Sequence, residues 1–143
     1  MGKSNKKSTK GALLKGVLEH VPSDSFEVLG PELKSMMKGY AGIYALYKKD
    51  KIYYVGLAKN LSGRIISHIE RSRHKGKWNQ FSVFMVARTK FLKDLETLVL
   101  RISKPPANKI RGKLPQHYRL TRQVASIANQ LRRKADKIRK ALR

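Results

Sequence analysis

Cysteine is absent from this sequence, so disulfide bonds, thiolate zinc sites and cysteine nucleophiles are all excluded. Long apolar runs are also missing: no stretch approaches the ~20 apolar residues of a membrane-spanning helix, and no membrane partner is expected. The basic N-terminus leads into no apolar core with a small-residue cleavage site, which argues against a signal peptide. These absences predict a cytoplasmic protein, associated with the nucleoid if the host is bacterial.

Acidic residues are scarce beside basic ones. The 143 residues include 33 Lys and Arg but only 9 Asp and Glu, for a formal net charge of +24. Self-repulsion makes such an imbalance costly for a compact fold, and a polyanion offsets it. Nucleic acid is the commonest polyanion, and we expect the partner to be a nucleic acid.

The N-terminal part of the chain predicts a tail and two short helices. Residues 1–10 are polar and basic, which is typical of a disordered tail. The apolar residues of the next segment recur at helical spacing: Leu13, Leu14, Val17 and Leu18. Pro31 favours the first turn of a second helix, which ends at Gly39. Residues 11–40 are therefore predicted to be a helical extension.

The central part of the chain alternates between strands and helices. Residues 42–56 contain two runs rich in Tyr, Ile, Val and Leu around a charged turn, which predicts a β-hairpin. A helix follows, with Asn60 or Ser62 as its cap. The apolar run 81–86 indicates a buried strand, and residues 91–102 an amphipathic helix. The order ββαβα predicts an α/β (α+β) domain whose three-stranded, mostly antiparallel sheet is flanked by helices.

The C-terminal part is predicted to be one long basic helix, residues 116–143, after a linker at residues 112–115. Its apolar residues recur every three or four positions and form one stripe: Leu120, Val124, Ile127, Leu131, Ala135, Ile138 and Leu142. The other faces are basic and would contact phosphates without reading sequence. The stripe must pack on something, and the rest of the chain, another protein and a second copy all remain open.

Two polar residues in the helix after the hairpin suggest phosphate chemistry. Arg64 and His68 are four residues apart and so lie one turn apart on one helix face. A guanidinium binds phosphate with two hydrogen bonds and stays charged at any working pH, and a histidine exchanges a proton near neutrality. The alternative is a basic helix face that contacts solvent or the DNA backbone.

Glu96 lies on or beside the apolar stripe of the helix at residues 91–102. Burying a carboxylate there is costly unless a positive group pairs with it. A divalent metal ion and an arginine are the two candidates. Asp94 is close by in sequence but falls off the apolar face, so Glu96 is preferred as a ligand.

Six positions in order connect these observations. The triplets Gly-Ile-Tyr at 42–44 and Tyr-Val-Gly at 54–56 are separated by nine residues. The four positions that follow them are Arg64, His68, Glu96 and Asn108. This pattern resembles the signature of the GIY-YIG nuclease family, which includes phage homing endonucleases and the incision subunit of bacterial nucleotide excision repair. The resemblance implies a GIY-YIG nuclease domain at residues 41–110.

The resemblance implies a catalytic role for each matching side chain. Tyr44 would activate or orient the water nucleophile as general base. His68 would accept or relay the proton of Tyr44, and Arg64 would hold the scissile phosphate and stabilise the transition state. Tyr54 would line the site and hydrogen-bond to phosphate or water.

The resemblance also implies one metal ion and three supporting residues. Glu96 would bind a single Mg²⁺ or Mn²⁺, hard cations suited to carboxylate and water ligands. Asn108 would position the helix that carries Glu96, or a phosphate. Gly42 and Gly56 would be structural, because glycine lets other groups approach the backbone closely.

The hairpin loop decides whether the two tyrosines share a site. A regular two-residue loop pairs Ala45 with Tyr54 and puts Tyr44 and Tyr54 on opposite faces of the sheet. A three-residue loop or a bulge pairs Leu46 with Tyr54 and puts both tyrosines on one face. Because the implied mechanism needs both tyrosines, we predict the odd loop or the bulge.

Basic residues near these motifs and in the C-terminal helix are candidates for nucleic-acid binding: Lys59, Arg71, Arg73, Lys75, Lys77, Arg119, Arg122, Arg132 and Arg133. His74 and Trp78 lie in the same basic segment as Lys75 and are further candidates for DNA contact. Trp78 has the alternative of a partly buried anchor for this loop.

These residues together predict a metal-dependent DNA endonuclease, with a possible homodimer because cutting both strands of a duplex needs two active sites. The alternative is a non-catalytic, RNA- or ribosome-associated binding protein with a small basic fold. The apparently complete set of site residues favours the nuclease.

Overall fold

The computed structural model describes residues 11–109, 112, 114 and 119–142. The disordered tail predicted for residues 1–10 lies outside the described residues, as does part of the predicted linker. The chain divides into two compact units, Met1–Gly112 and Lys113–Arg143. The elements of the first unit are β1 (Leu14–Pro22), α1 (Ser25–Met37), β2 (Gly42–Lys48), β3 (Lys51–Ala58), α2 (Leu61–Glu70), β4 (Gln80–Val86), the short 3₁₀ helix η1 (Thr89–Phe91) and α3 (Leu92–Ser103).

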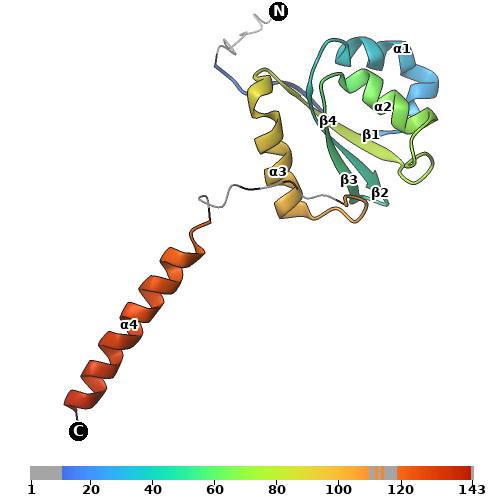
Figure 1. Cartoon of the computed structure of the whole chain (residues 1–143). Coiled ribbons are helices and arrows are strands. Elements are labelled where there is room, and N and C mark those ends of the chain that lie inside the picture. The colour runs from blue at the N-terminus through green and yellow to red at the C-terminus, as the bar shows by residue number, and fades with distance from the viewer. Residues whose placement is uncertain (1–10, 110–111, 113, 115–118, 143) are drawn as a thin grey trace, which may run out of the picture. The chain divides into compact units, whose positions relative to one another are not determined.

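The four strands form one antiparallel sheet in the order β1-β4-β2-β3 (Figure 1). Helices α1 and α2 cover one face of the sheet, and α3 covers the other (Figure 1). Each face has its own buried cluster: Tyr44, Leu46 and Phe81 pack against α1 and α2, whereas Ile43, Ala45 and Val55 pack against α3. The predicted α/β class is confirmed, with four strands in the sheet rather than three.

The additional strand corrects the prediction of a helix at residues 11–20. Strand β1 pairs with β4, and two register irregularities interrupt it, one before Gly16 and one after Leu18. His20, within the second irregularity, has a φ of +50°. The irregularities break the two-residue alternation of a strand and leave apolar residues at a spacing that resembles a helix. The predicted helical extension is therefore a strand followed by one helix.

Helix α1 begins earlier than predicted and bends in the middle. It starts at Ser25, and Leu29 inside it has non-helical backbone angles (φ −117°, ψ 23°). Pro31 comes two residues after this kink, so it occupies the start of the second helical segment. The predicted helix from Pro31 is thus the second half of α1.

The β2–β3 hairpin has a two-residue turn and a bulge. Lys49 and Asp50 both have positive φ, 50° and 61°, as a tight hairpin turn of this kind requires. Leu46 pairs with Tyr54, but the next pair is Tyr47 with Ile52, so one extra residue lies between them on β3. The prediction of an odd loop or a bulge is confirmed by the bulge, and Tyr44 and Tyr54 share one face of the sheet.

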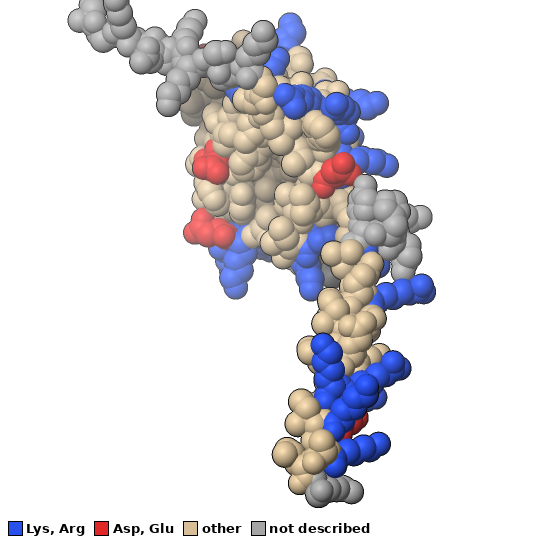
Figure 2. Space-filling model, turned by 90° about the vertical axis from the view of Figure 1, so that its left-hand side faces the viewer, with Lys and Arg blue, Asp and Glu red and all other residues tan. Residues whose placement is uncertain are grey.

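The second unit contains α4 (Thr121–Ala141), a 21-residue helix. Its apolar stripe is exposed within this unit, with exposed fractions between 56% and 63% at Val124, Ile127, Leu131 and Ile138. Figure 2 shows Lys and Arg side chains gathered along one side of this helix and uncharged ones along the other. None of the helices in the described ranges is long and apolar enough to cross a membrane.

Candidate active site

Tyr44 lies at the centre of the sheet, and two glycines make room around its strand. Tyr44 pairs with Gly56 across the hairpin. A Cβ atom on Gly56 would lie 2.4 Å from the Tyr44 hydroxyl oxygen and 2.5 Å from Cζ, so the phenol ring occupies the place of a side chain. A Cβ atom on Gly42 would lie 2.0 Å from the Phe84 carbonyl oxygen. Both glycines therefore permit the close approach that the sequence suggested.

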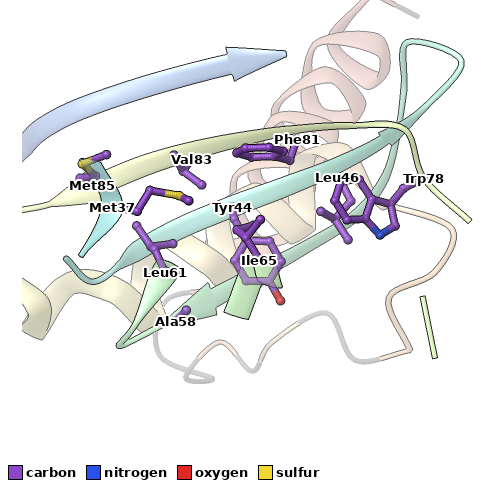
Figure 3. Close-up of a cluster of buried hydrophobic side chains, with 10 residues drawn as sticks. All are labelled: Met37, Tyr44, Leu46, Ala58, Leu61, Ile65, Trp78, Phe81, Val83 and Met85. Carbon is purple, nitrogen blue, oxygen red and sulfur yellow. The ribbon is translucent and has the colours of Figure 1, made fainter. Parts of the chain in front are cut away.

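The buried Tyr44 hydroxyl reaches a histidine on α2. Figure 3 shows Tyr44 inside the cluster under α1 and α2, with its hydroxyl oxygen at the edge of the cluster. This oxygen lies 2.7 Å from Nε2 of His68. Tyr44 is 2% exposed and His68 is 5% exposed, so bulk water has little access to this hydrogen bond. Asn60 caps the helix that carries His68 by accepting a hydrogen bond from the Gly63 amide at 3.2 Å.

Burial makes both partners neutral near pH 7. Burial raises the pKa of Tyr44 well above its usual value, with a further rise from the adjacent Tyr54 and a partial opposing effect from Arg64. Burial lowers the pKa of His68 to about 4, with help from the positive charges at His74 and Arg64. The ground state therefore pairs an uncharged phenol with an uncharged imidazole.

Tyr54 and Arg64 complete the near surroundings of Tyr44. The ring centroids of Tyr54 and Tyr44 are 6.1 Å apart, and those of Tyr54 and His68 are 5.7 Å apart. Arg64 is exposed and lines an open groove of about 500 Å³ with Lys59 and Ser67. Because its charge lowers the pKa of Tyr44, the guanidinium is electrostatically close to the hydroxyl while remaining open to a ligand.

Glu96 approaches from the other layer. It lies on α3, and its charge is close enough to raise the pKa of Tyr44. Glu96 is half-buried, and burial raises its own pKa, against which Lys93 has a smaller lowering effect. Within the described residues Glu96 forms no salt bridge, whereas Asp94 is exposed. Among the residues that the structure describes, no arginine pairs with this carboxylate.

The donor set at Glu96 fits a hard divalent cation. A half-buried carboxylate with a raised pKa and no salt bridge to a described residue gains from a positive ion beside it. No group of three His, Asp or Glu side chains converges anywhere in the described ranges. An ion at Glu96 would thus have one protein carboxylate, with water and phosphate oxygens as its other ligands, which is a coordination typical of Mg²⁺.

Asn108 joins the segment after α3 to the edge strand. Its Oδ1 accepts a hydrogen bond from the Val55 amide at 2.9 Å, and its Nδ2 donates one to the Val55 carbonyl at 2.7 Å. Ala107 adds a hydrogen bond from its amide to the Tyr53 carbonyl at 3.0 Å. With both ends of its side-chain amide engaged, Asn108 positions the chain that follows the Glu96 helix rather than a phosphate.

The segment after α2 adds hydrogen-bonded residues that the motif does not include. Ser72 Oγ lies 2.9 Å from Nδ1 of His68 and accepts the His74 amide at 3.1 Å. His74 is 5% exposed, so the prediction that it contacts DNA is wrong. Its Nδ1 lies 3.0 Å from the Tyr53 hydroxyl, and its Nε2 accepts a hydrogen bond from Arg73 at 3.3 Å. Burial lowers the pKa of His74, as do Arg73 and Lys77.

The basic candidates are all exposed, whereas Trp78 is not. Every residue of the predicted nucleic-acid set has an exposed side chain: Lys59, Arg71, Arg73, Lys75, Lys77, Arg119, Arg122, Arg132 and Arg133. On the face of the first unit in Figure 2, Lys and Arg lie toward the edges and uncharged side chains form the middle. Trp78 is buried and packs edge to face on Phe81, so it anchors the loop before β4.

Comparison with known proteins agrees with this geometry. Residues 40–109 match the family model described as the GIY-YIG catalytic domain. This chain has a GIY-YIG domain. The matched residues include Tyr44 and Asn108, and the whole matched range lies within the first unit. No curated protein matches the sequence of the chain.

Solved structures similar to this GIY-YIG domain include the N-terminal endonuclease domain of UvrC from Thermotoga maritima. One of these is a Tyr-to-Phe mutant bound to its catalytic divalent cation, with 20% sequence identity and a TM-score of 0.49. That match covers 56% of this chain and 94% of the other. Another is bound to magnesium, with 22% identity, a TM-score of 0.47, and coverage of 55% of this chain and 93% of the other.

Proposed function

We propose that this protein is a metal-dependent endonuclease that hydrolyses phosphodiester bonds in double-stranded DNA. The observation that carries the proposal is the buried hydrogen bond of 2.7 Å between the Tyr44 hydroxyl and Nε2 of His68. Arg64 and Glu96 lie close enough to this pair to affect the pKa of Tyr44. A purely structural tyrosine would not need a buried base beside its hydroxyl, together with an exposed guanidinium and a half-buried carboxylate whose charges affect its pKa.

The chain's own residues support a simple sequence of proton transfers. The Tyr44 O–H bond breaks, and its proton moves to Nε2 of His68. The resulting phenolate takes a proton from a water molecule, whose oxygen forms the new bond to phosphorus while the bond to the leaving oxygen breaks. Arg64, exposed in its groove, binds the non-bridging phosphate oxygens and stabilises the charge that develops on them.

Glu96 would hold the metal ion, Mg²⁺ or Mn²⁺. The ion supplies Lewis-acid stabilisation of the leaving oxygen when it is bound. The support for this assignment is the carboxylate itself, which is half-buried, has a pKa raised by burial and forms no salt bridge within the described residues. A nuclease of this kind would act where DNA is, as a cytoplasmic protein associated with the nucleoid in a bacterial host.

The charge of the chain supports a long polyanion as substrate. Lys59 lies in the groove of Arg64, and Arg71, Lys75 and Lys77 surround the loop after α2 with exposed charge. A duplex offers one phosphate about every 1.7 Å of its axis, which matches a dispersed basic surface better than a small ligand does.

The stripe of α4 supports a homodimer. Leu120, Leu131 and Leu142 are 11 residues apart, so the apolar stripe has a period of about 3.67 residues and runs nearly straight along the helix. A partner helix of the same kind would bury it. The basic residues are concentrated after Leu131, and an antiparallel arrangement would put each basic half beside the less charged half of the other helix.

Plasmid cleavage tests the nuclease. Supercoiled DNA is incubated with the protein and Mg²⁺ or Mn²⁺, and with Arg64→Ala and Glu96→Ala. We expect cutting by the wild type and a loss of about 10²-fold or more in each variant. Asp94→Ala, which removes an exposed carboxylate two residues from Glu96, is the matched control and should keep activity.

The outcomes separate the alternatives. Equal cutting by wild type and variants would indicate a contaminating nuclease. Tight binding of DNA or RNA without cutting in either metal would favour the non-catalytic binding protein. A parallel assay with RNA decides between the two nucleic acids.

Sedimentation of the full chain tests the homodimer. We expect a dimer in the wild type and a monomer after Ile127→Asp and Leu131→Asp together. A monomeric wild type at micromolar concentration would contradict the homodimer and indicate that the stripe packs within the chain or on another protein.

A further inference from the structure

We propose that Ser72 is a positioning residue that keeps the proton of neutral His68 on Nδ1, so that Nε2 is free to accept the proton of Tyr44. The catalytic meaning of this inference rests on the proposed nuclease function. The inference itself concerns one proton on one imidazole ring, and that proton can be located without any cleavage assay.

Ser72 is held in place by the backbone around it. It lies just beyond the end of α2, where its amide donates a hydrogen bond to the Ser67 carbonyl at 2.8 Å. Its hydroxyl oxygen accepts the His74 amide at 3.1 Å, a two-residue turn common for serine. The same oxygen lies 2.9 Å from Nδ1 of His68, opposite the nitrogen that faces Tyr44. Ser72 therefore faces the back of the imidazole ring in a fixed orientation.

Counting donors and acceptors distinguishes the two tautomers of His68. With the proton on Nε2, His68 would donate to Tyr44, and the hydroxyl proton of Tyr44 would need another acceptor. Tyr44 is 2% exposed, and its hydroxyl is hydrogen-bonded to His68 at 2.7 Å, with the Tyr54 side chain as another polar group beside it. That tautomer would leave the buried Tyr44 donor with Tyr54 alone, a contact that does not meet hydrogen-bond geometry, and this is costly.

The other tautomer satisfies every buried group. With the proton on Nδ1, Tyr44 donates to Nε2, and Nδ1 donates to Ser72 Oγ. The oxygen of Ser72 then accepts two hydrogen bonds, one from His68 and one from the His74 amide. The hydroxyl proton of Ser72 turns to water, because Ser72 is only half-buried. The count therefore favours Nδ1 protonation.

His74 provides an internal reference for the assignment. Arg73 donates from Nε to Nε2 of His74, and a guanidinium is always a donor. Neutral His74 must therefore carry its proton on Nδ1, from which it donates to the Tyr53 hydroxyl. The two imidazoles, with ring centroids 5.5 Å apart, should have the same tautomer for different reasons.

The arrangement has a consequence for the proton transfer. When Nε2 of His68 takes the proton of Tyr44, the imidazolium has two N–H groups. Nδ1–H keeps Ser72 as its acceptor, and Nε2–H faces the new phenolate, so no hydrogen bond has to be rebuilt during the step. Without Ser72 the ring would lose the acceptor of Nδ1–H, which favours this tautomer together with Tyr44 and holds the ring in place.

Long-range ¹H–¹⁵N spectra of the full chain at pH 7 locate the proton directly. We expect His68 to be protonated on Nδ1 in the wild type. In Ser72→Ala, where Nδ1–H has lost its acceptor while Tyr44 still faces Nε2, we expect the fraction protonated on Nε2 to rise. Ser72→Thr, which keeps the hydroxyl oxygen, should restore the wild-type pattern, and Ser35→Ala, on α1, should not change it. A wild-type His68 protonated on Nε2 would overturn the inference, as would a Ser72→Ala variant whose tautomer populations equal those of the wild type.

Cleavage kinetics supply the second measurement. We expect Ser72→Ala to lower kcat by about 10- to 100-fold, as the loss of an orienting partner typically does, with KM for DNA little changed. Ser72→Thr should recover most of kcat. If the wild type does not cut DNA at all, the proposed function fails, and the spectra still decide the tautomer. If the wild type cuts DNA and Ser72→Ala is as fast, Ser72 has no positioning role.

Discussion

The β2–β3 hairpin and helix α4 differ in how their side chains are presented, and the proposed nuclease would use them in opposite ways. In the hairpin, Tyr44 is 2% exposed and its ring occupies the space of a missing Gly56 side chain. In α4, the described side chains are exposed, and one face is lined with Lys and Arg. The hairpin holds the Tyr44 hydroxyl in a fixed position. The helix carries exposed positive charges, and affinity for a polyanion would depend little on their individual positions.

This difference indicates which property each region controls. Chemistry at a phosphate depends on atoms within a few tenths of an ångström of their place. Affinity for a polyanion depends mainly on the number of cations near it and so on salt. Changes in the hairpin should therefore reduce the rate of the chemical step, and changes in α4 should reduce affinity.

Removing the Tyr44 hydroxyl should have the largest effect. Tyr44→Phe keeps the ring that fills the space beside Gly56 but removes the donor to His68. We expect the rate at saturating DNA to fall by about 10²- to 10⁴-fold, with DNA affinity retained. Single-turnover cleavage and filter binding measure the two quantities. A variant that keeps full cleavage would exclude Tyr44 as the general base.

Adding one methyl group at Gly56 should have the second-largest effect on cleavage. The new Cβ of Gly56→Ala would overlap the Tyr44 hydroxyl, 2.4 Å away, and displace it from His68. We expect cleavage to fall by about 10²-fold and the free energy of unfolding by about 1–3 kcal/mol. Gly16→Ala is the matched control, since its Cβ meets only the flexible end of Met85 at 3.2 Å. Equal effects at the two glycines would contradict the close fit of Tyr44.

Lowering the pH should reduce the free energy of unfolding, because the buried His68 resists protonation. Its folded-state pKa of about 4 lies below the ordinary 6.5, so the unfolded chain binds the extra proton between these pH values. The free energy of unfolding should thus fall by up to about 3 kcal/mol as the pH drops from 6.5 to 4. His74, whose pKa is also lowered, acts in the same direction.

Urea unfolding at several pH values measures this dependence. His68→Gln should flatten the curve. Parallel curves for the wild type and His68→Gln would show that His68 is not buried in its neutral form.

Neutralising part of α4 should have the smallest effect on chemistry. In a triple variant, Arg132, Arg133 and Lys134 become Gln. We expect DNA affinity to fall and the slope of log affinity against log salt to decrease by up to about 3. A charge-conserving variant with Lys, Lys and Arg at these positions should keep the slope. A fall in the rate on bound DNA as large as that of Tyr44→Phe would contradict the division between the two regions.

The sequence was sufficient for the hairpin and insufficient for β1. In the hairpin, the two tyrosine triplets carried a resemblance that required both rings on one face, and only a bulge or an odd loop allows that. In β1, register irregularities near Gly16 and His20 disrupt the alternation on which strand prediction depends. The partner of β1 is β4, more than 60 residues away, and such pairing leaves no local signal.

Prediction of the site residues from the sequence had the same limit: it identified residues in a motif and missed one outside it. Tyr44, Arg64, His68 and Glu96 were identified by an ordered motif, and the electrostatic coupling of Tyr44 to the other site residues fits that identification. Ser72 belongs to no motif, and its role depends on the direction of a hydroxyl at the end of α2. Serine four residues after a histidine on a helix was the available signal, but serines at such positions are common and usually face solvent.

The side chain of Asn108 has a consequence for assembly. β3 is an edge of the sheet, and unpaired amides and carbonyls on an edge can recruit a strand from another molecule. The Asn108 amide occupies both outward groups of Val55, and Ala107 occupies the carbonyl of Tyr53, so these two residues stand in for a fifth strand. Strand-to-strand association along this edge is thereby blocked at Tyr53 and Val55, on either side of Tyr54.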